Sequence, residues 1–252
     1  MRTLILKLTA VLVIGISAIS PTHALDDLEK EEIGKFIREY LIKNPEVLAE
    51  AQAALEVRVA EQEKVRTREM IAGMSDRLYN AEGDVIIGNP EADVTIVEFF
   101  DYNCGFCKRA MNDMQEIVSA DPNVKFILKE FPILGEESLE ASRVSMAVAK
   151  IAPEKGADFH IALLGGGGRA GKAQAMKVAE DMGVDMDALN VALEDDALLD
   201  PISVTYNLAQ ELGINGTPSY VIGNEAVYGA VGVSDILSKV DNIRKCGETI
   251  CS

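Results

Sequence analysis

The sequence predicts an α/β fold: a frame of strand, helix and strand followed by a hairpin and a last helix, with a long helical insertion, preceded by a helical arm. Two runs rich in β-branched and aromatic residues, Val94 to Phe100 and Val124 to Glu130, flank a helical stretch, which gives the order strand, helix, strand. From Ser138 to Leu212 the pattern is helical, with breaks at proline and glycine. Between Leu25 and about Asn80 the chain is strongly charged and nearly free of glycine, as expected of helices outside a sheet domain.

The first 24 residues are predicted to be an export signal. Arg2 and Lys7 form a basic start, an apolar stretch runs from Leu8 to Ile19, and Thr22-His23-Ala24 ends in a small residue suited to cleavage. The apolar stretch is shorter than the roughly 20 residues that a membrane span requires. We therefore expect residues 1–24 to be a signal peptide cleaved after Ala24, with an uncleaved anchor as the alternative. The mature protein is then periplasmic, where disulfides persist.

The composition argues against several classes of partner. Hydrophobic residues make up 48% of the chain and charged residues 26%, which is ordinary for a globular protein with a core. The formal net charge is -17, and such a surface repels phosphate backbones and anionic lipid. We expect no nucleic-acid partner and no binding to a membrane surface.

Residues 25–82 are predicted to form the helical arm. Asn44 and Pro45 are typical of an N-cap and a first helical residue, so two helices are expected. Apolar positions follow helical spacing in both, at Ile33, Phe36, Ile37, Tyr40 and Leu41 and then, with Gln62 in the same seam, at Leu48, Ala51, Leu55 and Val59. So narrow a stripe needs a partner surface, either its own domain or the same helix of another subunit. Its length favours a homo-oligomer, a dimer or a trimer.

Residues 83–252 are predicted to form the second domain. A first strand at Val85 to Ile87 precedes the strand–helix–strand unit, and a turn at Gly223-Asn224 joins Ser219 to Ile222 with Ala226 to Tyr228 in a hairpin. A last helix is expected from about Ser234 to Arg244. This order matches a thioredoxin-like frame that carries a helical insertion at about 138–212.

The candidate chemistry lies at Cys104-Gly105-Phe106-Cys107, where the strand meets the helix. The N–H groups at a helix N-terminus stabilise negative charge, so the pKa of Cys104 should fall, and Cys107 should be the more buried, resolving thiol. A zinc site would need two further ligands, for which the spacing offers no support. A purely structural disulfide is the other alternative, but so short a loop gains little from closure.

Residues 99–109 (FFDYNCGFCKR) resemble the active-site strand and helix of DsbA-like bacterial thiol–disulfide oxidoreductases. Gly216-Thr217-Pro218 stands where that family carries its cis-proline loop, and the resemblance covers roughly residues 83–244. Residues 41–48 (LIKNPEVL) are similar to a branch that contains ScsC and Com1-like proteins. Some members of that branch oligomerise through the arm and act as disulfide isomerases.

The resemblance implies a role for each matching residue. Cys104 is the attacking thiolate and Cys107 the resolving thiol. Pro218, if cis, lies against the cysteine pair and leaves the backbone of Thr217 free to pair with an extended substrate; the sequence alone would leave that bond trans.

Glu98 and Lys129 match a buried acid–base pair that assists proton transfer beneath the family's site. The alternative is an ordinary ion pair between strands. The best-known oxidase of the family has Pro-His where this chain has Gly105 and Phe106. Without an imidazolium beside it, the pKa of Cys104 should be less depressed than in that enzyme, and the couple less oxidising.

Other candidate residues are given structural roles. We expect Cys246 and Cys251 to form a local structural disulfide, with a second redox pair or a link to another chain as alternatives. Gly165 to Gly168 lacks the Lys-Ser/Thr of a phosphate loop and is interpreted as a flexible connection between helices. His160, and Met70 with Met74, are interpreted as packing residues rather than catalytic or copper-binding ones. No metal and no cofactor is expected.

The predicted function is thiol–disulfide exchange with cysteine-containing protein substrates, as an isomerase or reductase. Thr217 before Pro218 also resembles isomerase and reductase relatives more than the strong oxidase. The resemblance implies a membrane redox partner of the DsbB or the DsbD/ScsB type. The alternatives are a monomeric dithiol oxidase, or a non-enzymatic metal-binding or surface protein on the same scaffold. A role in copper tolerance is a secondary hypothesis that rests on the resemblance alone.

Overall fold

The computed structural model describes residues 25–81 and 83–251, so the predicted signal peptide lies outside the described residues. The chain divides into two compact units between Arg58 and Val59. Within the described ranges, no helix has both the length and the apolar character needed to cross a bilayer.

The first unit contains α1 (Asp27–Lys43) and the beginning of α2 (Glu46–Gly73). Asp26 and Glu29 form a capping box at the start of α1, each side chain bonded to the other residue's backbone amide. The predicted start of a second helix at Asn44-Pro45 is confirmed to within a residue, since α2 begins at Glu46, but the predicted side-chain N-cap is wrong. Asn44 is the C-cap of α1, and both its backbone amide and its Nδ2 donate to the carbonyl of Tyr40, so the side chain does not cap α2.

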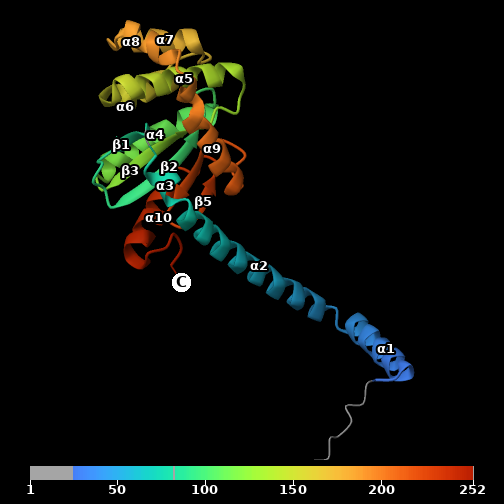
Figure 1. The fold of residues 1–252 in the computed structure, drawn as a ribbon. Helices are drawn as coiled ribbons and strands as arrows, with labels where there is room; N and C mark the ends of the chain where they lie inside the picture. Colours follow the sequence, from blue (N-terminus) through green and yellow to red (C-terminus); the bar gives the residue numbers. More distant parts are fainter. Residues whose placement is uncertain (1–24, 82, 252) are drawn as a thin grey trace, which may run out of the picture. The chain divides into compact units, whose positions relative to one another are not determined.

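The second unit is built on a five-stranded mixed sheet in the order β1-β3-β2-β4-β5 (Figure 1). The central strands β2 and β3 run parallel, and the other three pairs are antiparallel. The strands are β1 (Val85–Gly88), β2 (Val94–Phe100), β3 (Val124–Glu130), β4 (Ser219–Ile222) and β5 (Glu225–Tyr228). All five predicted strands are confirmed, because each is a short β-branched run bounded by turn residues.

Helices cover the sheet and fill the insertion between β3 and β4. In Figure 1 the helices α5 to α8 gather beyond one end of the sheet. The helices are α3 (Ser75–Tyr79), α4 (Gly105–Ala120), α5 (Glu136–Ile151), α6 (Gly156–Gly165), α7 (Lys172–Asp181), α8 (Met186–Leu193), α9 (Asp200–Glu211) and α10 (Val233–Cys246). Two short 3₁₀ turns, Pro153–Lys155 and Asp196–Leu199, join helices of the insertion.

Each face of the sheet has its own apolar core. One core joins the sheet to α4, α10 and the insertion, and includes Phe100, Phe126 and Met114. The other joins it to α3, α9 and the end of α2. Ile71 and Met74 at the end of α2 and Leu78 of α3 are buried in this second core.

Candidate active site

The cysteine pair lies where the buried strand β2 passes into α4. Cys104 is the N-cap of α4 in extended conformation, and the helix begins at Gly105. Cys107 follows one turn later and faces the core. Cys104 is 6% exposed and Cys107 is fully buried, as predicted from their order at a helix start. Both are free thiols in this structure.

The two thiols differ in how readily they ionise. A hydrogen bond with Cys107 lowers the pKa of Cys104 to about 5, supported by bonds from the Thr217 side chain and from the amides of Phe106 and Cys107, which together outweigh burial. Burial, together with the hydrogen bond to Cys104, raises the pKa of Cys107 far above its ordinary value. At neutral pH the site therefore holds one thiolate and one protonated thiol, the state that a nucleophile and a resolving cysteine require.

The Gly216-Thr217-Pro218 loop reaches the cysteine pair across 113 residues of sequence. The Thr217–Pro218 peptide bond is cis. In its protonated form the Cys104 thiol donates to the Thr217 carbonyl oxygen, with an Sγ to oxygen distance of 3.1 Å. The structure thus brings together Cys104, Cys107 and Thr217, as the resemblance implies.

The predicted pairing of Glu98 with Lys129 is wrong. In the parallel register of β2 and β3, Glu98 lies opposite Leu128, and Lys129 lies opposite Phe99. Because side chains alternate between the faces of a sheet, Glu98 and Lys129 point to opposite faces. Lys129 instead donates to Asp84 at 2.5 Å and to the carbonyl oxygen of Arg77 at 2.8 Å.

Glu98 lies buried on the α4 face of the sheet without a basic partner. Its Oε2 atom has no hydrogen-bond partner among the described residues. Burial, with smaller effects of the Asp113 and Cys104 charges, raises the pKa of Glu98 to about 8. When Glu98 is ionised, its negative charge in turn contributes to the raised pKa of Cys107. The residue therefore acts electrostatically on the cysteine pair without an ion-pair partner.

The two residues between the cysteines face outward. Phe106 is 57% exposed, and the Arg109 guanidinium lies over its ring at 4.3 Å from the centroid. A side chain added at Gly105 would meet no atom within 4 Å, so glycine leaves open space beside Cys104. Phe106 thus offers an apolar surface next to the Cys104 sulfur.

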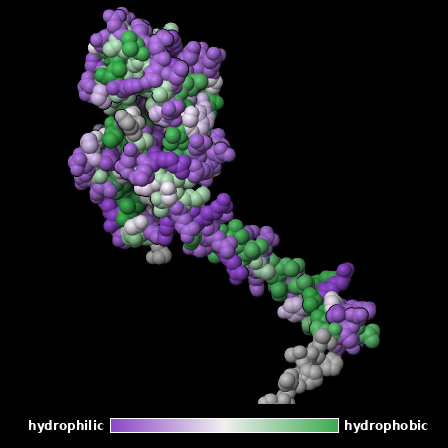
Figure 2. All heavy atoms as spheres, viewed as in Figure 1, coloured by the Kyte–Doolittle hydropathy of each residue, from purple (hydrophilic) through white to green (hydrophobic). Residues whose placement is uncertain are grey.

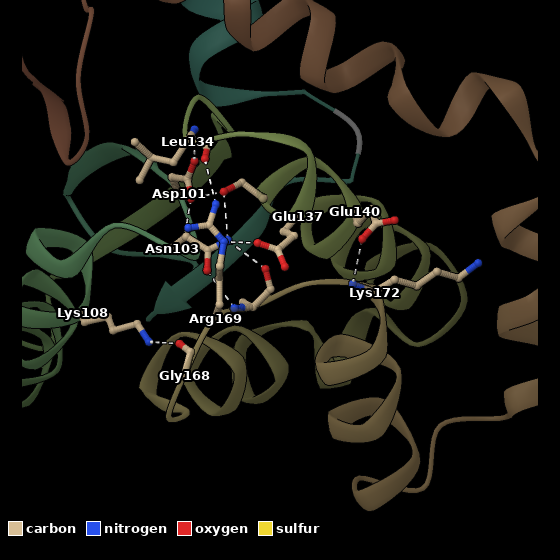
Figure 3. A network of polar contacts seen from close by, with 11 residues as sticks. Asp101, Asn103, Lys108, Leu134, Glu137, Glu140, Gly168, Arg169 and Lys172 are labelled. Atoms are coloured by element: carbon tan, nitrogen blue, oxygen red, sulfur yellow. Dashed lines mark hydrogen bonds and ion pairs between the residues drawn. The ribbon is translucent and has the colours of Figure 1, made fainter.

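Sequence reasoning missed the polar network that surrounds the turn before Cys104 (Figure 3). The fully buried Asp101 carboxylate accepts hydrogen bonds from the Asn103 amide at 2.7 Å, the Ser138 hydroxyl at 2.8 Å and the Leu134 amide at 2.9 Å. The Asp-x-Asn spacing directly before the cysteine could have predicted the bond between the Asp101 carboxylate and the Asn103 amide, because an aspartate side chain often bonds the backbone amide two residues further along the chain. Leu134 and Ser138 are beyond any local pattern.

The remaining candidates lie away from the cysteine pair. Cys246 and Cys251 form a disulfide at the end of α10. His160 is buried against the rings of Phe100 and Tyr102, and burial lowers the pKa of His160 to about 3, so it stays neutral. Within the described residues, no three His, Cys, Asp or Glu side chains gather as a metal site would require.

Comparison with known families gives two matches along the chain. A family described as the DSBA-like thioredoxin domain matches residues 95–241, and one described as the copper resistance protein ScsC N-terminal domain matches residues 29–62. The curated relatives are two Na(+)/H(+) antiporters, NhaA 1 of Salinispora arenicola and NhaA 3 of Salinispora tropica, which are 24% and 23% identical over 159 residues. The match takes in 62% of this chain, which spans about a quarter (24%) of the length of those relatives.

Several solved structures are similar over most of their own length. A thioredoxin-like oxidoreductase from Silicibacter pomeroyi DSS-3 is 42% identical, with a TM-score of 0.64 over 68% of this chain and 98% of that one. The thiol-disulfide exchange protein alpha-DsbA2 from Wolbachia pipientis is 30% identical, with a TM-score of 0.67 over 72% and 98%. Proteus mirabilis ScsC in a transitional conformation is 29% identical, with a TM-score of 0.64 over 88% and 98%.

Proposed function

The chain belongs to the DSBA-like thioredoxin family, in the branch that carries a ScsC N-terminal domain, and from that premise we propose that it exchanges disulfides with protein substrates through Cys104 and Cys107. One observation carries the proposal: the Cys104 thiolate is stabilised at the start of α4, beside the Thr217 carbonyl, with a protonated Cys107 one turn behind it. A nucleophile, a resolving thiol and a backbone edge for an extended chain meet at one point.

The chemistry proceeds through a mixed disulfide. The Cys104 thiolate attacks one sulfur of a substrate disulfide, a new S–S bond joins the two proteins, and the other substrate sulfur leaves as a thiolate. If that thiolate attacks another disulfide of the substrate, the pairing is changed and Cys104 is eventually released. If Cys107 loses its proton and attacks the Cys104 sulfur, the Cys104–Cys107 disulfide forms and the substrate leaves reduced by two electrons. We assign the ionised form of Glu98, on the same face of the sheet, to accept the Cys107 proton; because burial raises the pKa of Glu98 to about 8, the fraction in this form grows as the pH approaches 8.

Within this reaction we propose isomerisation or reduction as the main direction. The described part of the chain holds one histidine, His160, which is buried against Phe100 and neutral, so no imidazolium stabilises the Cys104 thiolate. A thiolate with one stabilising group fewer favours a less oxidising couple. Exposed Phe106 beside the site suits apolar segments of misfolded proteins.

We further propose that the arm makes the protein a homo-oligomer. No residue of α1 is buried, and its apolar side chains stay exposed along one stripe. Figure 2 shows hydrophobic surface along the first half of α2 and smaller hydrophobic areas on α1. A contiguous apolar patch of this kind marks an association site, and a second copy of the same stripe satisfies it. An oligomer holds several Cys104 sites around one substrate.

Export and redox recycling complete the proposal. Cleavage after Ala24 would deliver the mature chain to the periplasm. There the isomerase must be kept reduced, which calls for a membrane partner that supplies electrons through its own cysteines, of the DsbD/ScsB type; the oxidase alternative requires one of the DsbB type.

The test is refolding of a model protein with scrambled disulfides by the purified mature protein. We expect native substrate to be recovered, and the Cys104→Ser variant to lose about a hundredfold or more of the rate, since the nucleophile is gone. The double variant Cys246→Ser, Cys251→Ser is the matched control and should keep the activity.

If the protein rapidly oxidises a reduced substrate but recovers no native protein from the scrambled substrate, its function is that of an oxidase. Inactivity in both reactions would refute thiol–disulfide exchange as the function.

A further inference from the structure

The connection between α6 and α7 is fastened to the active-site helix. Lys108, in the second turn of α4, donates from its ammonium to the carbonyl oxygens of Gly166 at 2.9 Å and Gly168 at 3.3 Å. Gly168 has a φ of +78°, a conformation that favours glycine. The connection predicted to be flexible is thus held by direct bonds, shown in part in Figure 3.

Asn103 fastens the same connection from the turn before Cys104. Its Nδ2 donates to the Ala170 carbonyl at 2.8 Å, and its Oδ1 accepts from the Ala170 amide at 2.7 Å. The side-chain amide therefore pairs with one residue's backbone as a second peptide group would. Asparagine offers a donor and an acceptor at this length, whereas aspartate lacks the donor and alanine lacks both.

The same Asn103 side chain closes a ring of hydrogen bonds around the turn. Nδ2 also donates to the Ser138 hydroxyl at 2.9 Å, Ser138 donates to the Asp101 carboxylate, and that carboxylate accepts the Asn103 backbone amide. The Cys104 amide donates to the Asp101 carbonyl at 3.0 Å. Residues 101–104 are therefore held on one side by β2 and on the other by the insertion, through Ser138 of α5 and Ala170.

We propose that Asn103 is a positioning residue for thiol–disulfide exchange, which holds the Cys104 sulfur against the amides of α4 by joining the catalytic turn to Ser138 and Ala170. The inference rests on the proposed function of Cys104. Its physical basis is distance: hydrogen bonds to a sulfur anion weaken steeply with small changes of length and angle, and the turn that sets both is anchored through one side chain.

The test measures the alkylation of Cys104 by iodoacetamide across pH, with mass spectrometry of the Cys104 peptide, in the reduced protein. In Asn103→Ala we expect the midpoint for Cys104 to rise by about one pH unit and kcat/KM for disulfide reduction to fall about tenfold. In Ser138→Ala, an isosteric change that keeps the Asn103–Ala170 pair, we expect a smaller rise in the same direction.

The matched control is Asn242→Ala, which removes a half-buried asparagine bond of similar length, from Nδ2 to the Thr249 carbonyl at 2.9 Å, far along the chain from the turn. It should lower the melting temperature and leave the Cys104 midpoint unchanged. If Asn103→Ala behaves like this control, or if Ser138→Ala alone folds and shows no rise, Asn103 is only structural and the inference is overturned. Because alkylation needs no substrate, this result stands apart from whether the wild-type protein exchanges disulfides.

Discussion

The two buried acids beside the active-site helix differ in what surrounds their charged forms. The Cys104 thiolate receives hydrogen bonds from Cys107, from Thr217 and from backbone amides, which bring the pKa of Cys104 to about 5 although burial opposes this. Glu98 lacks such donors at Oε2, and burial raises the pKa of Glu98 to about 8. At neutral pH the thiol is ionised and the carboxyl protonated, the reverse of their order in water.

A first prediction concerns the pH dependence that Glu98 confers. Its pKa in the folded state exceeds that of the unfolded chain, so the folded state binds the extra proton and loses stability as pH rises between about 4.5 and about 8. In a Cys104→Ser, Cys107→Ser background, Glu98→Gln should remove this loss. Urea denaturation measures the free energy of unfolding at pH 5 and at pH 8. From pH 5 to pH 8, this free energy should fall by roughly 3 kcal/mol less in the Glu98→Gln variant than in the parent. Equal pH dependence of the two proteins would contradict the assignment.

At the scale of elements, the sheet separates two polar sites that the sequence seemed to join. Glu98 belongs to the α4 face, whereas Lys129 belongs to the face covered by α3 and α9. Lys129 is 3% and Asp84 14% exposed at the side chain. Burial raises the pKa of Asp84 to about 6 and lowers the pKa of Lys129, so desolvation outweighs their attraction. This pair joins β3 to the residue directly before β1.

A second prediction follows for Lys129→Met. The change leaves the Asp84 carboxylate buried and unpaired, so it should destabilise the fold by about 3 kcal/mol at pH 7 and by less at pH 5, where Asp84 takes up a proton. The alkylation midpoint of Cys104 should stay unchanged because the sheet lies between them. Urea denaturation and iodoacetamide labelling measure the two effects.

Lys125→Met on the same strand is the matched control for that experiment. The Lys125 ammonium bonds only the exposed Pro90 carbonyl in the described structure, so the loss should be within about 0.5 kcal/mol. If the alkylation midpoint of Cys104 rises in Lys129→Met, Lys129 acts on the cysteine pair, which would contradict this prediction.

For the whole molecule, the question is what covers the apolar stripe of the arm. The aromatic rings of Phe36 and Tyr40 stack at 6.2 Å between centroids and are exposed within a single chain. The α1 capping box makes the helix begin at a defined residue without tertiary help. An arm built as a regular helix with its apolar side uncovered is suited to assembly with further copies.

A third prediction tests that assembly in the mature chain. Phe36→Asp places a carboxylate in the proposed interface, which costs about 2 kcal/mol or more and should weaken association at least about thirtyfold. Light scattering across protein concentration measures the mass. Isomerisation of a scrambled substrate should fall with the mass, while reduction of a small disulfide persists.

Val191→Asp is the control, since Val191 is an exposed apolar residue on α8 with 74% exposure against 69% for Phe36. Association that survives Phe36→Asp unchanged, or that is weakened equally by Val191→Asp, would refute the arm as the interface.

The sequence by itself determined the elements and the position of the cysteine pair. A β-branched run, a Cys-x-x-Cys and a helical pattern follow one another directly between Val94 and Ala120, so short-range propensity and spacing suffice to place Cys104 at the start of a helix. The hairpin at Gly223-Asn224 was predictable for the same reason. The resemblance added the Thr217–Pro218 loop, which no local pattern joins to Cys104.

Only the tertiary structure decided which side chains meet. The register of β2 against β3 sends Lys129 away from Glu98 and toward Asp84, and a shift of one residue would have reversed this. Docking of the insertion brings Ala170 to Asn103 across 67 residues of sequence. Both outcomes depend on how whole elements pack, because alternation and packing choose a side chain's partner only after the strands and helices have found their places.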